Sequence, residues 1–592
     1  MNRLLTPLAL AVLVASTLAA PTLGARGTDP NVVFRAMKAE MDRSMRELRM
    51  DDLRRPYHIE YAVTIRRAVS AHAILGSVED TDTASVMTVD VRVRVGNETF
   101  DNTNFFDVSL GFFGSTDDEE EFRTRRVPMA SDERRLQREL WLATDACYKQ
   151  ALEIFSKKEA TLKNKTRIDT TPDFRLLPPT EQSDVRHRTV RGNIADVVNT
   201  IVPLSAIFRD YPDIYSSRVG MEIVPVERFV LTSEGRKIHT VHIFCGLEVI
   251  ATTQAENGQY LGQTYAAYGT LPTDLPSADS LRRAITSMAR LLAAQRTAPT
   301  IEAYSGPVLF QDQAAGEVFM QHFAPQLVAQ RPPLSDAGFS AGESSMAFQN
   351  KIGARVLPEF LSVSSVPLKE KDKGRNVVGA YRIDDEGIAA RDMVVVEKGY
   401  LRTLLASRVP TKRIRESNGS MRGGAAMYSV LEVRTDDAKR ALDGKALRAR
   451  LLKLVKDRAL PYGIVVRKAL NTNLLYTGIY PMVGADFPLP RGEGKLGLLE
   501  VVRVFPDGRE EIVRGVEAAG LAPLVFKDIV ATSQATTVHS ALVPSVAPSF
   551  ITGGSQYLAA SVITPDLLFE DVEIRPLEGD VPKLPLLSSP LR

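Results

Sequence analysis

The sequence predicts an α+β protein of more than one domain. With 592 residues the chain is too long for one hydrophobic core and suits two or three domains. Apolar residues at helical spacing are frequent before residue 300, and short strands joined by glycine-containing turns are frequent after it. We therefore predict a mixed α/β N-terminal domain over residues 26–300 and a β-rich C-terminal domain over residues 301–592.

The N-terminal domain is expected to open with an amphipathic helix over residues 31–49, because Val33, Met37, Met41 and Leu48 recur at helical spacing. Strands are predicted at 57–64 and 84–95, where apolar and polar residues alternate. The remaining elements are helices at 131–165, 193–208 and 276–298, with strands at 226–233, 240–255 and 259–268.

The C-terminal domain is predicted to begin with a strand at 303–310, followed by a helix that starts near Met320. Glycine turns at 398–399 and 506–508 indicate two hairpins, 393–406 and 496–514. A further helix is expected at 443–457. Residues 331–346, rich in Ser, Gly and Pro, indicate a loop.

The N-terminus has the pattern of a secretory signal peptide over residues 1–25. Arg3 gives a basic start, an apolar run extends from Leu4 to about Leu23, and cleavage is expected after Ala20 or Ala25. A retained anchor is the alternative, but the run is short and interrupted by prolines. It contains no Cys, which excludes a lipoprotein anchor. We predict a bacterial protein exported to the periplasm or beyond, with no stable membrane span after cleavage.

The charge of the chain is balanced, with 74 basic and 72 acidic side chains, which gives no case for nucleic-acid binding by bulk charge. The acidic run at 117–121 lacks the glycine turn and spaced ligands of a calcium loop, so a solvated loop is expected. The two cysteines, Cys147 and Cys245, could pair in an oxidising compartment. Their placement in a helix and a strand favours two buried, unpaired thiols instead.

Four segments of the chain carry recognisable motifs: residues 230–268, 304–317, 383–423, and 551–555 with 569–574. The third is the most specific, because it contains an Asp-Asp-Glu-Gly turn, a Val-Glu-Lys-Gly hairpin and a Ser-Asn-Gly-Ser-Met-Arg stretch. In this order, the four segments resemble the TldD/PmbA family of metallopeptidase-like proteins.

The resemblance implies an α+β N-terminal domain, a β-rich C-terminal domain that houses the active site, and paired subunits. In this family the TldD-type subunit carries a His-Glu-x-x-x-His zinc motif. The PmbA-type subunit, also called TldE, lacks the motif and completes the chamber. The pair degrades unfolded peptides and processes a peptide antibiotic precursor.

This chain departs from the family's zinc motif. If the resemblance is carried over residue by residue, Met320 replaces the first His, Gln321 the Glu and Pro325 the second His. The third ligand of the family is a C-terminal Cys, and this chain has no Cys after Cys245. A thioether is a poor zinc ligand, an amide cannot act as a base, and proline offers no ligand atom. We therefore expect no catalytic residues, no cofactor and a degenerate metal site.

Two histidines are weak alternative ligands. His322 follows Gln321 directly, and His539 lies near the family's Cys region. Glu317 precedes His322 by five residues, which places the two about 140° apart around a helix. A serine nucleophile is disfavoured because no Gly-x-Ser-x-Gly elbow occurs.

The functional hypothesis is a non-catalytic partner in a metallopeptidase pair that acts on unfolded peptides. Its partners would be a peptide or unfolded segment, held by addition to a sheet edge, and a second subunit in a homodimer or in a heterodimer with a TldD-type chain. The alternatives are an active metallopeptidase with unusual ligands and a stand-alone peptide-binding protein.

Overall fold

The computed structural model describes most of the chain after residue 28. The described residues are 29–106, 124–129, 132–163, 170–335, 347–474, 489, 492–546, 557–579, 581–587 and 589–590. The predicted signal peptide, the acidic run at 117–121, the segment 551–555 and most of the loop 331–346 lie outside them. Within the described part, no helix is long and apolar enough to cross a membrane.

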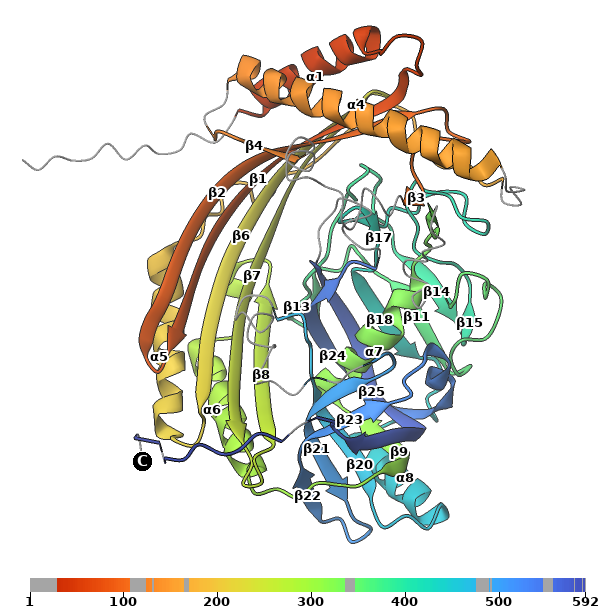
Figure 1. Cartoon of the computed structure of the whole chain (residues 1–592). Coiled ribbons are helices and arrows are strands. Elements are labelled where there is room, and N and C mark those ends of the chain that lie inside the picture. Colours follow the sequence, from red (N-terminus) through yellow and green to blue (C-terminus); the bar gives the residue numbers. More distant parts are fainter. Residues whose placement is uncertain are drawn as a thin grey trace, which may run out of the picture.

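The N-terminal half forms one long sheet, which is antiparallel except for the parallel pair of β5 and β7 (Figure 1). Alternating β-branched residues and tight glycine turns favour such strands. The order of its main path is β4-β2-β1-β6-β7-β5, and β8 pairs with β7. The strands are β1 (Pro56–Ile74), β2 (Ser77–Val95), β4 (Thr124–Val127), β5 (Thr180–Asp184), β6 (Ser216–Thr232), β7 (Arg236–Gln254) and β8 (Tyr260–Gly269).

Four helices cover one face of this sheet. Side chains alternate between the two faces of a strand, and the odd positions of β1 from Ile59 to Ile65 join a core with α1 (Pro30–Glu47) and α4 (Glu133–Lys163). Farther along the same face, Val69 to Ala73 pack with α5 (Ile194–Ser205) and α6 (Ala278–Gln295). The opposite face is left to the C-terminal domain, where Ala62 and Ile238 contact Ile383.

The C-terminal half is built on a second sheet that wraps around one buried helix, α7 (Asp312–His322), with α8 (Gly444–Asp457) packed outside. Its main path runs β15-β14-β11-β18-β25-β23-β21-β20-β9, and β24 pairs with β25. The strands are β9 (Tyr304–Phe310), β11 (Leu361–Ser365), β14 (Met393–Glu397), β15 (Tyr400–Leu401), β18 (Val430–Thr435), β20 (Gly463–Ala469), β21 (Leu496–Val504), β23 (Val516–Ala519), β24 (Ile529–Pro544) and β25 (Tyr557–Pro576).

Short elements complete the description. The strands are β3 (Phe105–Phe106), β10 (Leu334–Ser335), β12 (Lys371–Asp372), β13 (Arg375–Asn376), β16 (Met421–Arg422), β17 (Ala425–Ala426), β19 (Ala441–Leu442) and β22 (Glu510–Val513). Single 3₁₀ turns occur at Ala206–Asp210, Pro272–Asp274, Ala324–Leu327 and Pro523–Asp528.

Buried arginines join the two domains. Arg236 on β7 donates to the carbonyl oxygens of Glu386 (3.1 Å) and Gly387 (2.8 Å) in the C-terminal domain. In the other direction, Arg408 pairs with Glu234, with 2.7 Å between Nη2 and Oε1. Because these groups are buried, each contact fixes the domains at one relative position.

The α+β class and most elements predicted from the sequence are confirmed, but β6 begins ten residues earlier than predicted, β24 and β25 were not predicted, and other elements differ in extent. Strands β1 and β2 are much longer than predicted, because they pair along almost their whole length. The strand predicted to reach residue 406 ends at Leu401. Met320 lies in the last turn of α7 instead of at its start. Cys147 and Cys245 form no disulfide bond with each other; both are buried, as expected, and they belong to separate cores.

Candidate functional site

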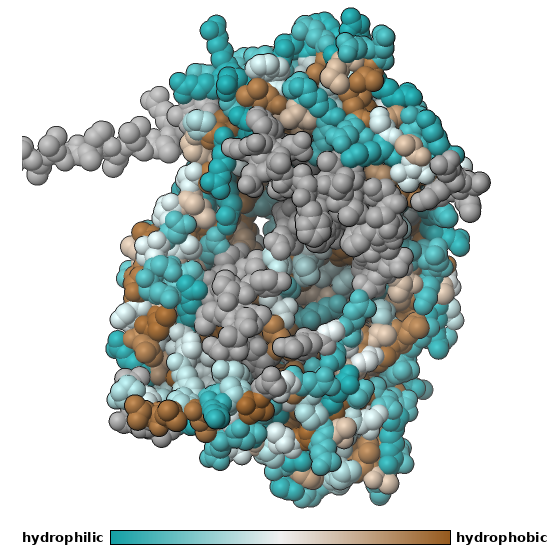
Figure 2. Space-filling model, viewed as in Figure 1, coloured by the Kyte–Doolittle hydropathy of each residue, from teal (hydrophilic) through white to brown (hydrophobic). Residues whose placement is uncertain are grey.

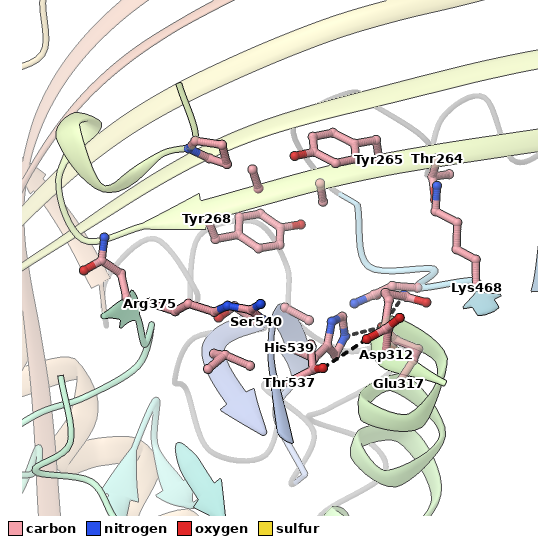
Figure 3. Close-up of a pocket in the computed structure, with 18 of the residues that line it drawn as sticks. Thr264, Tyr265, Tyr268, Asp312, Glu317, Arg375, Lys468, Thr537, His539 and Ser540 are labelled. Atoms are coloured by element: carbon pink, nitrogen blue, oxygen red, sulfur yellow. Dashed lines mark hydrogen bonds and ion pairs between the residues drawn. The ribbon is translucent and has the colours of Figure 1, made fainter. Parts of the chain in front are cut away.

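A cleft of about 690 Å³ lies between the two domains, where β8 faces the C-terminal sheet. The surface is hollowed between the domains in the space-filling view (Figure 2). Residues 264–268 of β8 form one wall, and residues 537–541 of β24 form the other with the exposed side of α7 (Figure 3). The cleft therefore lies between two strands, each close to an edge of its own sheet.

Helix α7 reaches the cleft because it is apolar on only one side. Ala314, Val318, Phe319 and their neighbours are buried in the C-terminal core. Gln313, Glu317 and Gln321 recur every four residues and share the other face. Gly316 lets β24 approach this helix, since a Cβ at Gly316 would lie 2.3 Å from the Cβ of His539.

Glu317 is the centre of the polar network on that face. Its side chain is 1% exposed, and Oε2 lies 2.6 Å from Nε2 of His539. Gln321 donates to Oε1 of Glu317 at 2.8 Å and to the carbonyl oxygen of Leu470. Gln313 donates to Glu317 and binds the backbone of Ala469 through both its amide atoms. The network joins α7 to β20 and β24, so it fixes the floor of the cleft.

Two cations point into the cleft. Lys468 is partly buried and has no hydrogen bond or ion pair with another described residue, and its burial lowers its pKa to about 8. Arg375 is exposed and likewise has no ion pair within the described part of the chain. Asp312, the first residue of α7, also lines the cleft, and its carboxylate accepts a hydrogen bond from Thr537. Its backbone φ is 46°. A non-glycine residue in the left-handed region is uncommon and often occurs at a functional site.

The residues singled out from the sequence lie in different environments. Met320 is fully buried in the core, away from the cleft, and its carbonyl oxygen accepts from Tyr428. Pro325 lies in the 3₁₀ turn after α7. Gln321 reaches the network described above. His322 is half-buried, its Nε2 has no partner in the described structure, and burial lowers its pKa to about 4.

The residues around α7 do not fit a zinc ion. Zinc sites in enzymes use three protein ligands and an open position. Glu317 and His539 lie together, but the nearest additional side chains on the helix are amides, which bind zinc poorly. In the part of the chain that the structure describes, no three His, Cys, Asp or Glu side chains are grouped to hold a metal.

Sequence reasoning missed the pairing of Glu317 with His539, because the two residues are 222 positions apart. It also missed Lys468, which appears in the sequence as an ordinary residue at a strand end. The four-residue spacing of Gln313, Glu317 and Gln321 could have revealed a polar face on an otherwise apolar helix.

Part of the C-terminal domain matches a known family of protein domains. Residues 303–470 match the PmbA/TldA metallopeptidase C-terminal domain. This region contains β9, α7 and β20, and therefore the α7 part of one wall of the cleft. No curated protein matches the chain by sequence.

Solved structures share the fold over nearly the whole chain. TldE from Thermococcus kodakarensis is 13% identical, with a TM-score of 0.54, and the match covers 91% of this chain and 99% of that one. A protein described as a possible modulator of DNA gyrase from Bacteroides thetaiotaomicron is 13% identical, with a TM-score of 0.55 and coverages of 92% and 99%. A similarly described protein from Thermotoga maritima is 12% identical, with a TM-score of 0.53 and coverages of 87% and 96%. At these identities the likeness concerns the fold alone.

Proposed function

Since the chain belongs to the TldD/PmbA family, we propose that it is a non-catalytic member that holds an extended peptide in the cleft between its domains. In this role it is exported and serves as the partner of a TldD-type metallopeptidase subunit. A stand-alone peptide-binding protein would use the same cleft in the same way.

The observation that carries the proposal is the position of β8. Within the described residues, β8 pairs only with β7, and residues 264–268 line the cleft. An unpaired strand edge offers a row of backbone donors and acceptors to an added strand. An extended peptide satisfies these groups, and the width of the cleft leaves space for its side chains.

The network on α7 supports a role without catalysis. A general base must reach the water or group from which it takes a proton. Glu317 is buried, and its two oxygens already accept from Gln321 and His539. Gln321 itself has no basic atom. The contact of Glu317 with His539 therefore serves to hold α7 against β24.

The experiment measures binding and cleavage of the same peptide. A fluorescent, unfolded peptide is titrated with the purified protein, and its anisotropy and its mass are followed. Ala266, in the middle of β8 and on the cleft wall, is replaced in Ala266→Trp to fill the cleft. The matched control is Ala438→Trp, at an exposed turn position.

We expect an intact peptide, with affinity for Ala266→Trp weaker by about tenfold or more, since a blocked edge removes several hydrogen bonds. Ala438→Trp should bind as the wild type does. Equal binding by all three proteins would refute the use of this cleft.

The second candidate is an active metallopeptidase with unusual ligands, in which Glu317 and His539, side by side on the cleft floor, would supply two of the three protein ligands that a zinc enzyme needs. That function requires stoichiometric metal and chelator-sensitive cleavage, which the same peptide assay detects.

Pairing with a second subunit and export need separate tests. Co-expression with an exported TldD-type protein of the same organism, followed by size-exclusion chromatography, should give one co-eluting complex. Mass spectrometry of the secreted chain should find an N-terminus at residue 21 or 26.

A further inference from the structure

A second cavity, of about 300 Å³, lies at the other end of the domain interface. It is enclosed by the β1–β2 sheet, by α4 and by C-terminal residues that include β17 (Figure 1). Its lining shares no residue with the cleft described above. It is therefore a separate space, and neither the zinc motif nor the peptide proposal involves it.

Two side chains that line this cavity have unused hydrogen-bonding atoms. His58 is 1% exposed, and neither ring nitrogen has a hydrogen-bond partner among the described residues. Oε1 of Glu234 lies 3.9 Å from its Nε2. Nε2 of Gln330 is also buried without a partner there. A buried polar atom without a partner costs about 1–3 kcal/mol, so such atoms call for an occupant.

Arg92 supplies a positive charge to the same cavity. Its guanidinium makes no hydrogen bond with another described residue, and Nη1 lies 3.6 Å from Oε1 of Glu60. The other lining arginines are already satisfied, because Arg94 donates to Asp101 and Arg331 to the carbonyl oxygen of Pro172. Among these arginines, Arg92 is thus the one whose N–H groups have no hydrogen-bond acceptor among the described residues, although Glu60 partly balances its charge.

Glu60 also lines the cavity and lies beside Arg92, whereas His58 and Glu386 add no further negative charge. Burial of His58, together with Arg94 and Arg408, lowers its pKa well below the usual value, so the ring is neutral and can donate one N–H. Burial and the charge of Asp384 raise the pKa of Glu386, which also lines the cavity. A protonated Glu386 adds a donor in place of a negative charge.

Part of the wall is apolar. Phe105, Ala151, Ile154, Phe174, Val409 and Met421 contribute to it. Phe174 is held rigidly, because Arg94 and Arg408 stack over its ring at 3.7 and 4.3 Å from the centroid. Convergent donors beside an apolar surface are typical of a small-molecule site.

We propose that this cavity is a second binding site, which takes a small carboxylate with an apolar body. The planar fork of Arg92 suits a carboxylate, to which guanidinium groups bind through two parallel hydrogen bonds. His58 and Gln330 donate to the remaining oxygen positions, and the apolar wall receives the rest of the molecule. Ordered water alone is the competing occupant.

Calorimetric titration with N-acetylvaline tests the proposal, and N-acetylvalinamide is the matched probe without the charge. We expect the acid to bind at least about tenfold more tightly than the amide, the ratio for one charge-assisted hydrogen bond. Arg92→Gln should weaken binding of the acid by a similar factor. The control Arg126→Gln removes an exposed arginine on β4 and should leave the affinity unchanged.

Gln330→Leu provides a second variant, so the test holds even if Arg92→Gln does not fold. Ala266→Trp separates the two proposals, because it blocks the cleft and should not alter binding of N-acetylvaline. The proposal is overturned if the acid and the amide bind equally, if neither gives heat at millimolar concentration, or if both cavity variants bind as the wild type does. Tighter binding of inorganic phosphate would also overturn it.

Discussion

Gly316 gives the sharpest test of the contact between α7 and β24. In an ordinary exposed helix, Gly→Ala stabilises by about 1 kcal/mol, because alanine loses less backbone entropy. Here the new Cβ would lie 2.3 Å from the Cβ of His539 and 2.7 Å from its Cγ. Carbon atoms pack at about 3.5–4.0 Å, so the strand or the helix must move by more than an ångström.

That movement has two costs. Overpacking in a filled core costs about 1–3 kcal/mol. The 2.6 Å contact between His539 and Glu317 would be stretched, and a hydrogen bond to a charged group contributes about 1.5–3 kcal/mol. After the helix gain is subtracted, Gly316→Ala should lower the free energy of unfolding of the C-terminal domain by about 2–4 kcal/mol.

The assay is urea denaturation followed by circular dichroism. The matched control is Gly444→Ala at the start of α8, where a Cβ would meet nothing within 4 Å, so a small gain or no change is expected. The reasoning is refuted if Gly316→Ala is as stable as Gly444→Ala.

The other predictions concern Lys468 and Arg236. Because burial lowers the pKa of Lys468 to about 8 from 10.5, its charge weakens folding below pH 8, and the penalty disappears as the pH rises from 8 to 10.5. Lys468→Met should therefore stabilise the protein by up to about 3 kcal/mol at pH 7 and not above pH 10.5, by urea denaturation at both pH values. Equal effects at the two pH values would contradict this. Arg236→Met leaves the carbonyl oxygens of Pro178, Glu386 and Gly387 without this donor and should lower the free energy of unfolding by about 3 kcal/mol. The control Lys237→Met removes an exposed ion pair and should lower it by less than about 1 kcal/mol. Similar midpoints for these two variants would show that the domain contact is weak.

The fold was largely predictable because its signals are local. The alternation in residues 86–95 and the turn at 256–258 are sufficient to indicate strands, and the spacing of Leu281, Ile285 and Met288 indicates α6. The extension of β1 and β2 was not predictable. Residues 77–83 are exposed and polar, and only pairing with the partner strand makes them a strand.

The candidate site was less predictable, because it depends on contacts between distant segments. The polar face of α7 is visible in the sequence, but His539 arrives from β24 and Lys468 from the end of β20. The second cavity shows the same limit: His58, Arg92 and Gln330 carry no motif, and their unused donors appear only once the domains are packed. The identification of Met320, Gln321 and Pro325 with the zinc motif stays a prediction.

Metal analysis of the purified protein together with the peptide assay tests the central claim most directly. The account predicts no stoichiometric, tightly held zinc, and an unfolded peptide that binds in the cleft and remains intact. One zinc per chain, with cleavage of the peptide that a chelator abolishes, would contradict it.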